Sequence, residues 1–146
     1  MNFEVRAARC EDAEALVRLN LDFNGSGGPD AESVEASIRE NRQEIVILAT
    51  ADGQGAGFCC LRVARSMCYC APAGEIAELY VDPRFRRRGL ASGMIRLAEE
   101  LCLKQGATKI HLLTGGDNRS ARAFYEKMGY RLDGEVHYGR TLDQGQ

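Results

Sequence analysis

Hydrophobic and polar positions form short periodic blocks in the N-terminal part of the chain. Residues 3–7 alternate between apolar and polar side chains, which predicts a β-strand. A helix is expected from Glu11, because acidic residues fill its first turn and apolar residues follow at helical spacing. A glycine-rich break at 24–28 separates it from a second helix, which we expect to begin near Pro29.

The middle of the chain combines strand patterns with one long helical pattern. Residues 45–49 and 57–63 are apolar runs joined across an Asp-Gly turn, and they predict a β-hairpin. Residues 75–81 form the next predicted strand. Between Gly89 and Gly106 the apolar residues recur at the spacing of an amphipathic helix, so we expect a long helix there.

The C-terminal part continues with strand and helix patterns. Residues 109–114 predict a strand, residues 120–128 a helix, and residues 130–142 a final strand pair around an Asp-Gly turn. The order β-α-α-β-β-β-α-β-α-β-β predicts a mixed sheet covered by helices, with one βαβ crossover over residues 75–114. The expected fold class is therefore α/β, of the mixed α+β kind, in a single domain over residues 1–146.

Length and composition are ordinary for one globular domain. The chain has 146 residues, of which 45% are hydrophobic and 27% charged. No apolar stretch is long enough to span a membrane and the N-terminus lacks a signal-peptide pattern, so we expect a cytoplasmic protein without a membrane partner. The six cysteines are expected to be free thiols, and their spacing does not predict a metal site.

Charge is distributed unevenly along the chain. The net charge is −2, but residues 1–82 carry 7 Lys/Arg against 14 Asp/Glu, a net of −7. Residues 83–146 carry 12 against 7, a net of +5. A basic half suits a polyanionic cofactor and an acidic half suits a cationic partner. Scattered solvated charge is the alternative; the clustering of arginines at 84–88 favours the functional interpretation for the basic half.

The segment Val81-Asp-Pro-Arg-Phe-Arg-Arg-Arg-Gly-Leu-Ala-Ser-Gly93 joins a predicted strand to the long predicted helix. Within it, Arg86–Ala91 has the form Arg-x-x-Gly-x-Ala. Gly89 allows a tight turn, and the small side chains of Ala91 and Ser92 leave room for a phosphate. The helix dipole and free amides predict a diphosphate site. Neither a Walker A loop nor Gly-x-Gly-x-x-Gly occurs, and a nucleic-acid-facing patch remains an alternative for the arginines alone.

A second motif follows the next predicted strand: Asn118-Arg-Ser-Ala-Arg-Ala-Phe-Tyr-Glu-Lys-Met-Gly-Tyr130. Together the two motifs resemble those of the GNAT superfamily of acyl-CoA-dependent N-acetyltransferases, Arg/Gln-x-x-Gly-x-Gly/Ala and Asn-x-x-Ala-x-x-Phe-Tyr-x-x-x-Gly-Phe/Tyr. Ala91 stands where glycine is frequent in the family. The resemblance covers the whole element order, and it implies a central sheet of about seven strands, splayed between strands 4 and 5, with about four helices on its faces.

The resemblance also implies that the diphosphate is that of acetyl-CoA. The loop amides would hold it, namely those of Arg87, Arg88, Gly89, Leu90, Ala91 and Ser92. Its 3′-phosphate would be reached by an arginine among Arg84, Arg86, Arg87 and Arg88. Leu79, Tyr80 and Val81 would pair edge-wise with the pantetheine arm, as an added strand does. Asn118 would contact the same arm while also serving as a helix N-cap.

Acetyl transfer to an amine requires a proton acceptor, because alkyl amines are charged at neutral pH. Glu78 is the favoured acceptor and Glu75 the second, with carboxylates facing solvent as the alternative for both. Strict alternation puts Glu78 on the face of Ile76 and Tyr80, unless a bulge intervenes. His111 is expected to be structural.

The remaining chemistry concerns the oxyanion and the leaving thiolate. A backbone N–H of Leu79 or Tyr80 would stabilise the oxyanion. By resemblance, Tyr125 would donate a proton to the thiolate, and a core aromatic beside Phe124 is the alternative.

The acceptor is the part of the function with the weakest signal. The acidic bias of residues 1–82 favours a small cationic amine, such as an aminoglycoside, a polyamine or an amino-acid derivative. A protein N-terminus or lysine is the next choice, and a non-catalytic acyl-CoA sensor is a more remote one. The sequence pI of about 5.7 disfavours a nucleic-acid partner. A homodimer is expected only from the resemblance to the family.

Overall fold

The structure of the protein is a computed structural model that describes residues 1–145. Five strands, four α-helices and two short 3₁₀ helices are found in these residues. In chain order they are β1 (Phe3–Ala7), η1 (Cys10–Asp12), α1 (Ala13–Asn24), α2 (Ala31–Glu40), β2 (Ile45–Ala51), β3 (Gln54–Ala64), β4 (Ala73–Val81), η2 (Pro83–Phe85), α3 (Leu90–Lys104), β5 (Lys109–Leu112) and α4 (Arg119–Lys127).

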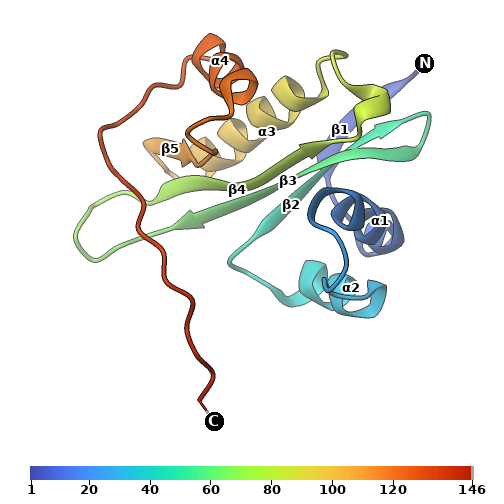
Figure 1. The fold of residues 1–146 in the computed structure, drawn as a ribbon, viewed down its shortest axis with the longest axis horizontal. Coiled ribbons are helices and arrows are strands. Elements are labelled where there is room, and N and C mark those ends of the chain that lie inside the picture. The colour runs from blue at the N-terminus through green and yellow to red at the C-terminus, as the bar shows by residue number, and fades with distance from the viewer. Residues whose placement is uncertain (146) are drawn as a thin grey trace. The chain divides into compact units, whose positions relative to one another are not determined.

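The strands form one mixed sheet in the order β1-β2-β3-β4-β5 (Figure 1). Neighbouring strands are antiparallel from β1 to β4, and β5 is parallel to β4. The parallel pair requires a crossover, which α3 supplies. The mixed α/β class and the βαβ unit expected from the sequence are therefore confirmed.

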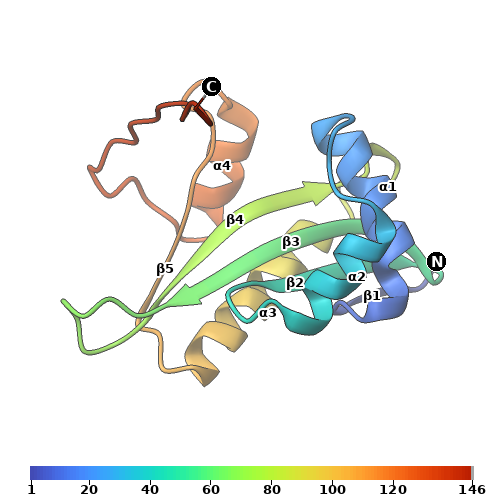
Figure 2. The same cartoon turned by 90° about the horizontal axis from the view of Figure 1, so that it is seen from below.

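Helices cover both faces of the sheet in the part of the chain up to residue 113 (Figures 1 and 2). On one face, α1 and α2 pack over a buried cluster that consists of Leu16, Leu19, Leu48, Phe58 and Tyr80. On the other face, α3 buries Met94, Ile95 and Ala98 completely. The sheet thus has a distinct α1/α2 face and α3 face, and every side chain of β4 belongs to one of them.

Strands β4 and β5 pair over only part of their length. Their last paired residues are Ile76 and Leu112. Beyond that point β4 continues to Val81, so β5 lies beside only its first half (Figure 1). The splay expected between strands 4 and 5 is confirmed.

The number of strands differs from the expectation. About seven were expected, but the structure has five, because residues 130–142 form no strand. The expected Asp-Gly turn is present, with Gly134 at φ 83° and the N–H of Glu135 bonded to the Asp133 carboxylate at 3.0 Å. The apolar side chains around it are exposed, Leu132 by 79%. A two-stranded hairpin that buries no apolar face is at best marginally stable, and no ladder forms.

The chain divides into two compact units. The first runs from Met1 to Leu113 and contains the sheet with α1, α2 and α3. The second begins at Thr114 and contains α4. Within residues 1–145 no helix combines the length and apolar character needed to cross a bilayer.

Candidate active site

The turn between β4 and α3 has an unusual backbone. Arg87 has φ 63° and Gly89 has φ 82°, both in the left-handed region. Glycine adopts this conformation freely, whereas a residue such as Arg87 does so at a cost, and such residues concentrate at functional sites. Helix α3 begins directly afterwards, at Leu90. We call residues 86–92 the phosphate loop.

The amides of the phosphate loop are available to a ligand. The first helical bond of α3 runs from the N–H of Gly93 to the carbonyl of Gly89, at 3.0 Å. No acceptor within residues 1–145 is assigned to the N–H groups from Arg87 to Ser92, and Gly89 provides no side-chain cap. Arg86 to Gly89 are exposed. Free amides at a helix N-terminus, with the positive end of its dipole, favour an anion.

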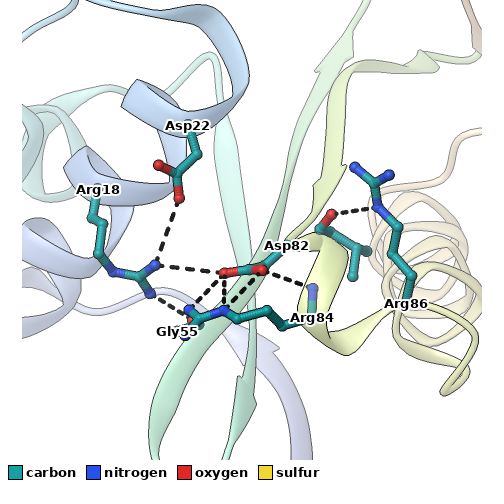
Figure 3. Close-up of polar contacts among 7 residues, drawn as sticks. Arg18, Asp22, Gly55, Asp82, Arg84 and Arg86 are labelled. Carbon is teal, nitrogen blue, oxygen red and sulfur yellow. Dashed lines mark hydrogen bonds and ion pairs between the residues drawn. The ribbon is translucent and has the colours of Figure 1, made fainter.

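Asp82 anchors the base of this loop (Figure 3). Its side chain is only 5% exposed, and it accepts hydrogen bonds from Arg84 through the backbone N–H at 2.9 Å and through Nη2 at 2.8 Å. These hydrogen bonds from Arg84 hold the pKa of Asp82 below its ordinary value. The guanidinium of Arg84 is therefore already neutralised by a carboxylate of the protein.

Two further arginines fix the same region (Figure 3). Arg18 of α1 donates to the carbonyl of Gly55 at 2.7 Å, and its Nη1 lies 3.7 Å from both Asp82 and Asp22. Arg86 donates from Nε to the carbonyl of Val81 at 2.9 Å. Arg18 thus links helix α1 to the base of the phosphate loop.

Replacing Asp82 tests this anchor. We expect Asp82→Asn to lower the free energy of unfolding by about 1.5 kcal/mol near pH 7, the lower end of the range for hydrogen bonds to charged groups. The pKa of Asp82 lies below its ordinary value of 3.8 in the folded chain. The stabilisation is therefore present above pH 3.8 and is lost as the pH falls through the lower folded-state value. Urea unfolding at several pH values measures it.

Asp22→Asn is the matched control for that experiment. Asp22 is 46% exposed and its pair with Arg18 spans 3.7 Å, so its loss should cost under about 0.5 kcal/mol. Equal losses for Asp22→Asn and Asp82→Asn, or a difference independent of pH, would contradict the role given to Asp82.

The free edge of β4 lies next to the phosphate loop. The N–H of Asp82 bonds to the carbonyl of Ala56 at 2.8 Å, toward β3. Backbone groups alternate between the two edges of a strand, so those of Tyr80 also point to β3, whereas those of Leu79 and Val81 point outward. The outward-pointing carbonyl of Val81 accepts the hydrogen bond from Arg86 Nε. The N–H and C=O of Leu79 and the N–H of Val81 therefore have no strand partner within residues 1–145.

A β-bulge reorganises the side chains of β4. Glu78 pairs with Cys60 of β3, but Ile76 pairs with Leu61, so Ala77 has no partner. Glu78 therefore shares the α1/α2 face with Tyr80 and not with Ile76. The strict alternation expected from the sequence is wrong at this point, because the extra residue shifts the pleat.

The same bulge places Glu75 and Glu78 on one face. Three positions apart on a regular strand they would face opposite sides. Glu75 pairs with Arg62 and lies 3.8 Å from His111, whereas Glu78 faces Cys60. Burial raises the pKa of the Cys60 thiol, which excludes it as a ready nucleophile. The face therefore offers two carboxylates and an imidazole.

Asn118 and Tyr125 belong to the second unit. Asn118 is the N-cap of α4, and its side-chain oxygen accepts from the N–H of Ala121 at 3.2 Å. Tyr125 lies on α4, with its ring centroid 5.5 Å from that of Phe124. The N-cap role expected for Asn118 is confirmed. The other expected site residues, from Glu75 to Ser92, belong to the first unit.

Three residues of this region were not predicted from the sequence. Asp82 precedes Pro83, and an Asp followed by Pro is a signal for a helix N-cap. Arg18 stands four residues before Asp22, a spacing that indicates an ion pair on a helix. His111 had no such signal, because its partner is set by the β4/β5 register.

Comparison with known proteins identifies the family. The model of the acetyltransferase (GNAT) family matches residues 13–130, well over half of the chain. The chain belongs to the GNAT acetyltransferase family. It is an acetyl-CoA-dependent acyltransferase, as its relatives named N-acetyltransferase also indicate.

One such relative is the uncharacterized N-acetyltransferase YhfO of Bacillus subtilis, 29% identical over 140 residues that cover 92% of this chain and 94% of the relative. Among solved structures, an aminoglycoside N-acetyltransferase in complex with CoA has a TM-score of 0.83 at 20% identity, covering 96% of this chain and 95% of that one. Glucosamine-6-phosphate N-acetyltransferase from Arabidopsis thaliana has a TM-score of 0.85 at 20% identity, covering 98% and 100%. At these identities the likeness shows the fold alone, and the two acceptors differ.

Proposed function

We propose that this acetyltransferase acetylates a primary amine of a small cationic acceptor, of the aminoglycoside, polyamine or amino-acid kind. The observation that carries the proposal is the placement of Glu75 and Glu78 on one face of the sheet, beside the free edge of β4. The net charge of −7 over residues 1–82 supports it, since a negative field attracts a cation. A neighbour in fold is an aminoglycoside N-acetyltransferase. A protein N-terminus or lysine is the alternative acceptor.

The phosphate loop fits the diphosphate of acetyl-CoA. Its six consecutive residues from Arg87 to Ser92 have N–H groups without an assigned acceptor in the described chain. We propose that these amides hold the diphosphate. Arg84 is neutralised by Asp82, and Arg86 is bonded to Val81. Arg87 and Arg88 are therefore the arginines proposed for the 3′-phosphate.

The free edge of β4 is proposed to hold the pantetheine arm. Leu79 offers a carbonyl acceptor on this edge and Val81 an N–H donor, which are the groups that an amide-containing chain needs to add itself as a strand. Tyr80 is less suited, because its backbone groups point toward β3. Asn118 is proposed to contact the arm, as its place in the family motif implies.

The proposed chemistry is direct transfer. Acetyl-CoA supplies the acetyl thioester that the amine attacks and the thiolate that leaves. Glu78, with Glu75 second, attracts the acceptor ammonium and takes up its proton through water. The N–H of Leu79 donates to the acetyl oxygen as negative charge develops there. Tyr125 returns a proton to the thiolate, a role that rests on its place in the Asn118–Tyr130 motif.

The acceptor proposal is tested by thiol release from acetyl-CoA over a panel of kanamycin, spermidine, lysine and an acetylatable peptide. We expect turnover with a small polycation and little with the peptide. Preferential turnover of the peptide would favour the alternative acceptor. Thermal stabilisation by acetyl-CoA without turnover of any amine would indicate a sensor, and stabilisation by DNA would contradict the assignment of the loop.

A further inference from the structure

His111 and Glu75 face each other across β5 and β4. The distance from His111 Nε2 to Glu75 Oε2 is 3.8 Å. Their positions are paired directly in the register, one step before Ile76 and Leu112, where the pairing ends. The two side chains therefore lie where the strands begin to part, on the α1/α2 face of the sheet.

This pair shares its face with the carboxylate proposed to meet the acceptor. The bulge at Ala77 turns Glu78 to the same side as Glu75. Glu78 lies directly before Leu79, whose backbone groups open the free edge. The side chain of His111 is 53% exposed and that of Glu75 is 34% exposed, so water reaches both. The solvent-exposed imidazole thus lies on the same face as Glu78, beside Glu75 and four residues before Leu79 along β4, so a proton that passes between them moves through water.

The reaction releases one proton from the acceptor ammonium, and this proton must reach solvent. An acceptor ammonium carries three protons; one stays on the new amide, one goes to the leaving thiolate, and the third must be released. A carboxylate is a weak base for this purpose, because glutamic acid ordinarily has a pKa of about 4.3 whereas alkyl ammonium groups have one near 10. Imidazoles are better matched to proton transfer at neutral pH.

We propose that His111 receives, through water, the proton that Glu78 takes from the acceptor ammonium and passes it to solvent, with Glu75 facing the imidazole across the two strands. This inference rests on the proposed acetyl transfer. It gives the two glutamates different roles. Glu78 attracts the ammonium and is the first acceptor of its proton, and Glu75 is a positioning residue that acts through His111.

The charged groups around the imidazole are few. On β4 it faces Glu75, with Glu78 farther along the strand. Arg62 of β3 is paired with Glu75 in the register but also lies 3.8 Å from Glu44, the residue before β2. Lys109 shares the face of His111 on β5. Within residues 1–145, Glu75 is the carboxylate paired with the imidazole, and Arg62 is paired with Glu44.

His111→Gln separates proton transfer from packing, because glutamine keeps polar atoms and similar bulk. The measurement is thiol release with the panel amine that the wild type turns over fastest, from about pH 6.5 to pH 9.5. We expect kcat/KM to fall about 20-fold at neutral pH, less than the usual loss of a general base because Glu78 remains. The deficit should shrink toward pH 9.5, as more of the amine is already neutral.

Two variants sharpen the result. Glu75→Gln should give a smaller deficit with the same pH dependence, because the imidazole remains without its carboxylate. His137→Gln, at the other histidine, should match the wild type at every pH. Thermal stabilisation by acetyl-CoA should be unchanged in all three variants.

The inference is overturned if His111→Gln matches the wild type, or if its deficit is the same at every pH, as lost packing would give. If the wild type turns over the amine and His111→Gln gives either of these results, this inference alone is overturned and the proposed function stands. Absence of turnover in the wild type, with stabilisation by acetyl-CoA intact, overturns the proposed function and this inference with it.

Discussion

Tyr125→Phe is expected to lower kcat about 100-fold, within the range for removing a general acid, and to leave the KM for acetyl-CoA nearly unchanged. Phenylalanine keeps the ring that lies 5.5 Å from Phe124, so packing on α4 is preserved and only the hydroxyl is removed. The loss should therefore appear in the chemical step. Steady-state kinetics at varied acetyl-CoA, repeated at alkaline pH, measures it.

The comparison variant is Tyr138→Phe, since Tyr138 is 90% exposed. It should leave both kinetic constants as they are. If Tyr125→Phe keeps the wild-type rate across alkaline pH, Tyr125 is a packing residue and another group protonates the thiolate.

Gly57→Ala is expected to destabilise the fold by about 3 kcal/mol, the upper part of the usual cost of overpacking a core. A Cβ at Gly57 would lie 2.6 Å from the carbonyl oxygen of Tyr80 and 3.2 Å from the Cα of Val81. Both are backbone atoms, so the end of β4 must move to relieve the clash. Urea unfolding measures the loss.

The same substitution reports on the active site. The displaced segment carries Val81 and leads into Asp82, so acetyl-CoA binding should weaken as well as stability. Gly116→Ala is the control, because a Cβ there meets no atom within 4 Å and alanine restricts the unfolded chain. It should be neutral or slightly stabilising. If Gly57→Ala unfolds at the same urea concentration as the wild type, β4 accommodates the added Cβ without loss of stability.

Local patterns predicted most of the fold. The strand expected over 45–49 is found as β2, the helix expected after Gly89 is α3, and the helix expected over 120–128 is α4, each within a few residues at its ends. These elements have clear periodicity and recognisable end signals, such as the left-handed Gly106 after α3. The pattern over residues 130–142 was equally regular, but a strand also needs a partner and a buried face, which no local pattern supplies.

The site was predicted less completely. The phosphate loop and the motif at Asn118 are continuous in sequence, so they were found directly. The pairing of Glu75 with His111 depends on the register of β4 and β5, and the common face of Glu75 and Glu78 depends on a bulge at Ala77. Register and bulges are set by contacts distant in sequence, and alternation alone gave the wrong side for Glu78 relative to Ile76.

The parting of β4 from β5 has a consequence for the solubility of the protein. A strand edge with free N–H and C=O groups is a template for a strand from another molecule, and such edges promote aggregation. The free edge at Leu79 and Val81 is short. The bulge at Ala77 precedes it in the chain, and at its other end the carbonyl of Val81 accepts a hydrogen bond from Arg86. An acetyl-CoA molecule paired along this edge would bond the backbone groups that are still free. Bound acetyl-CoA should therefore also reduce self-association of the protein.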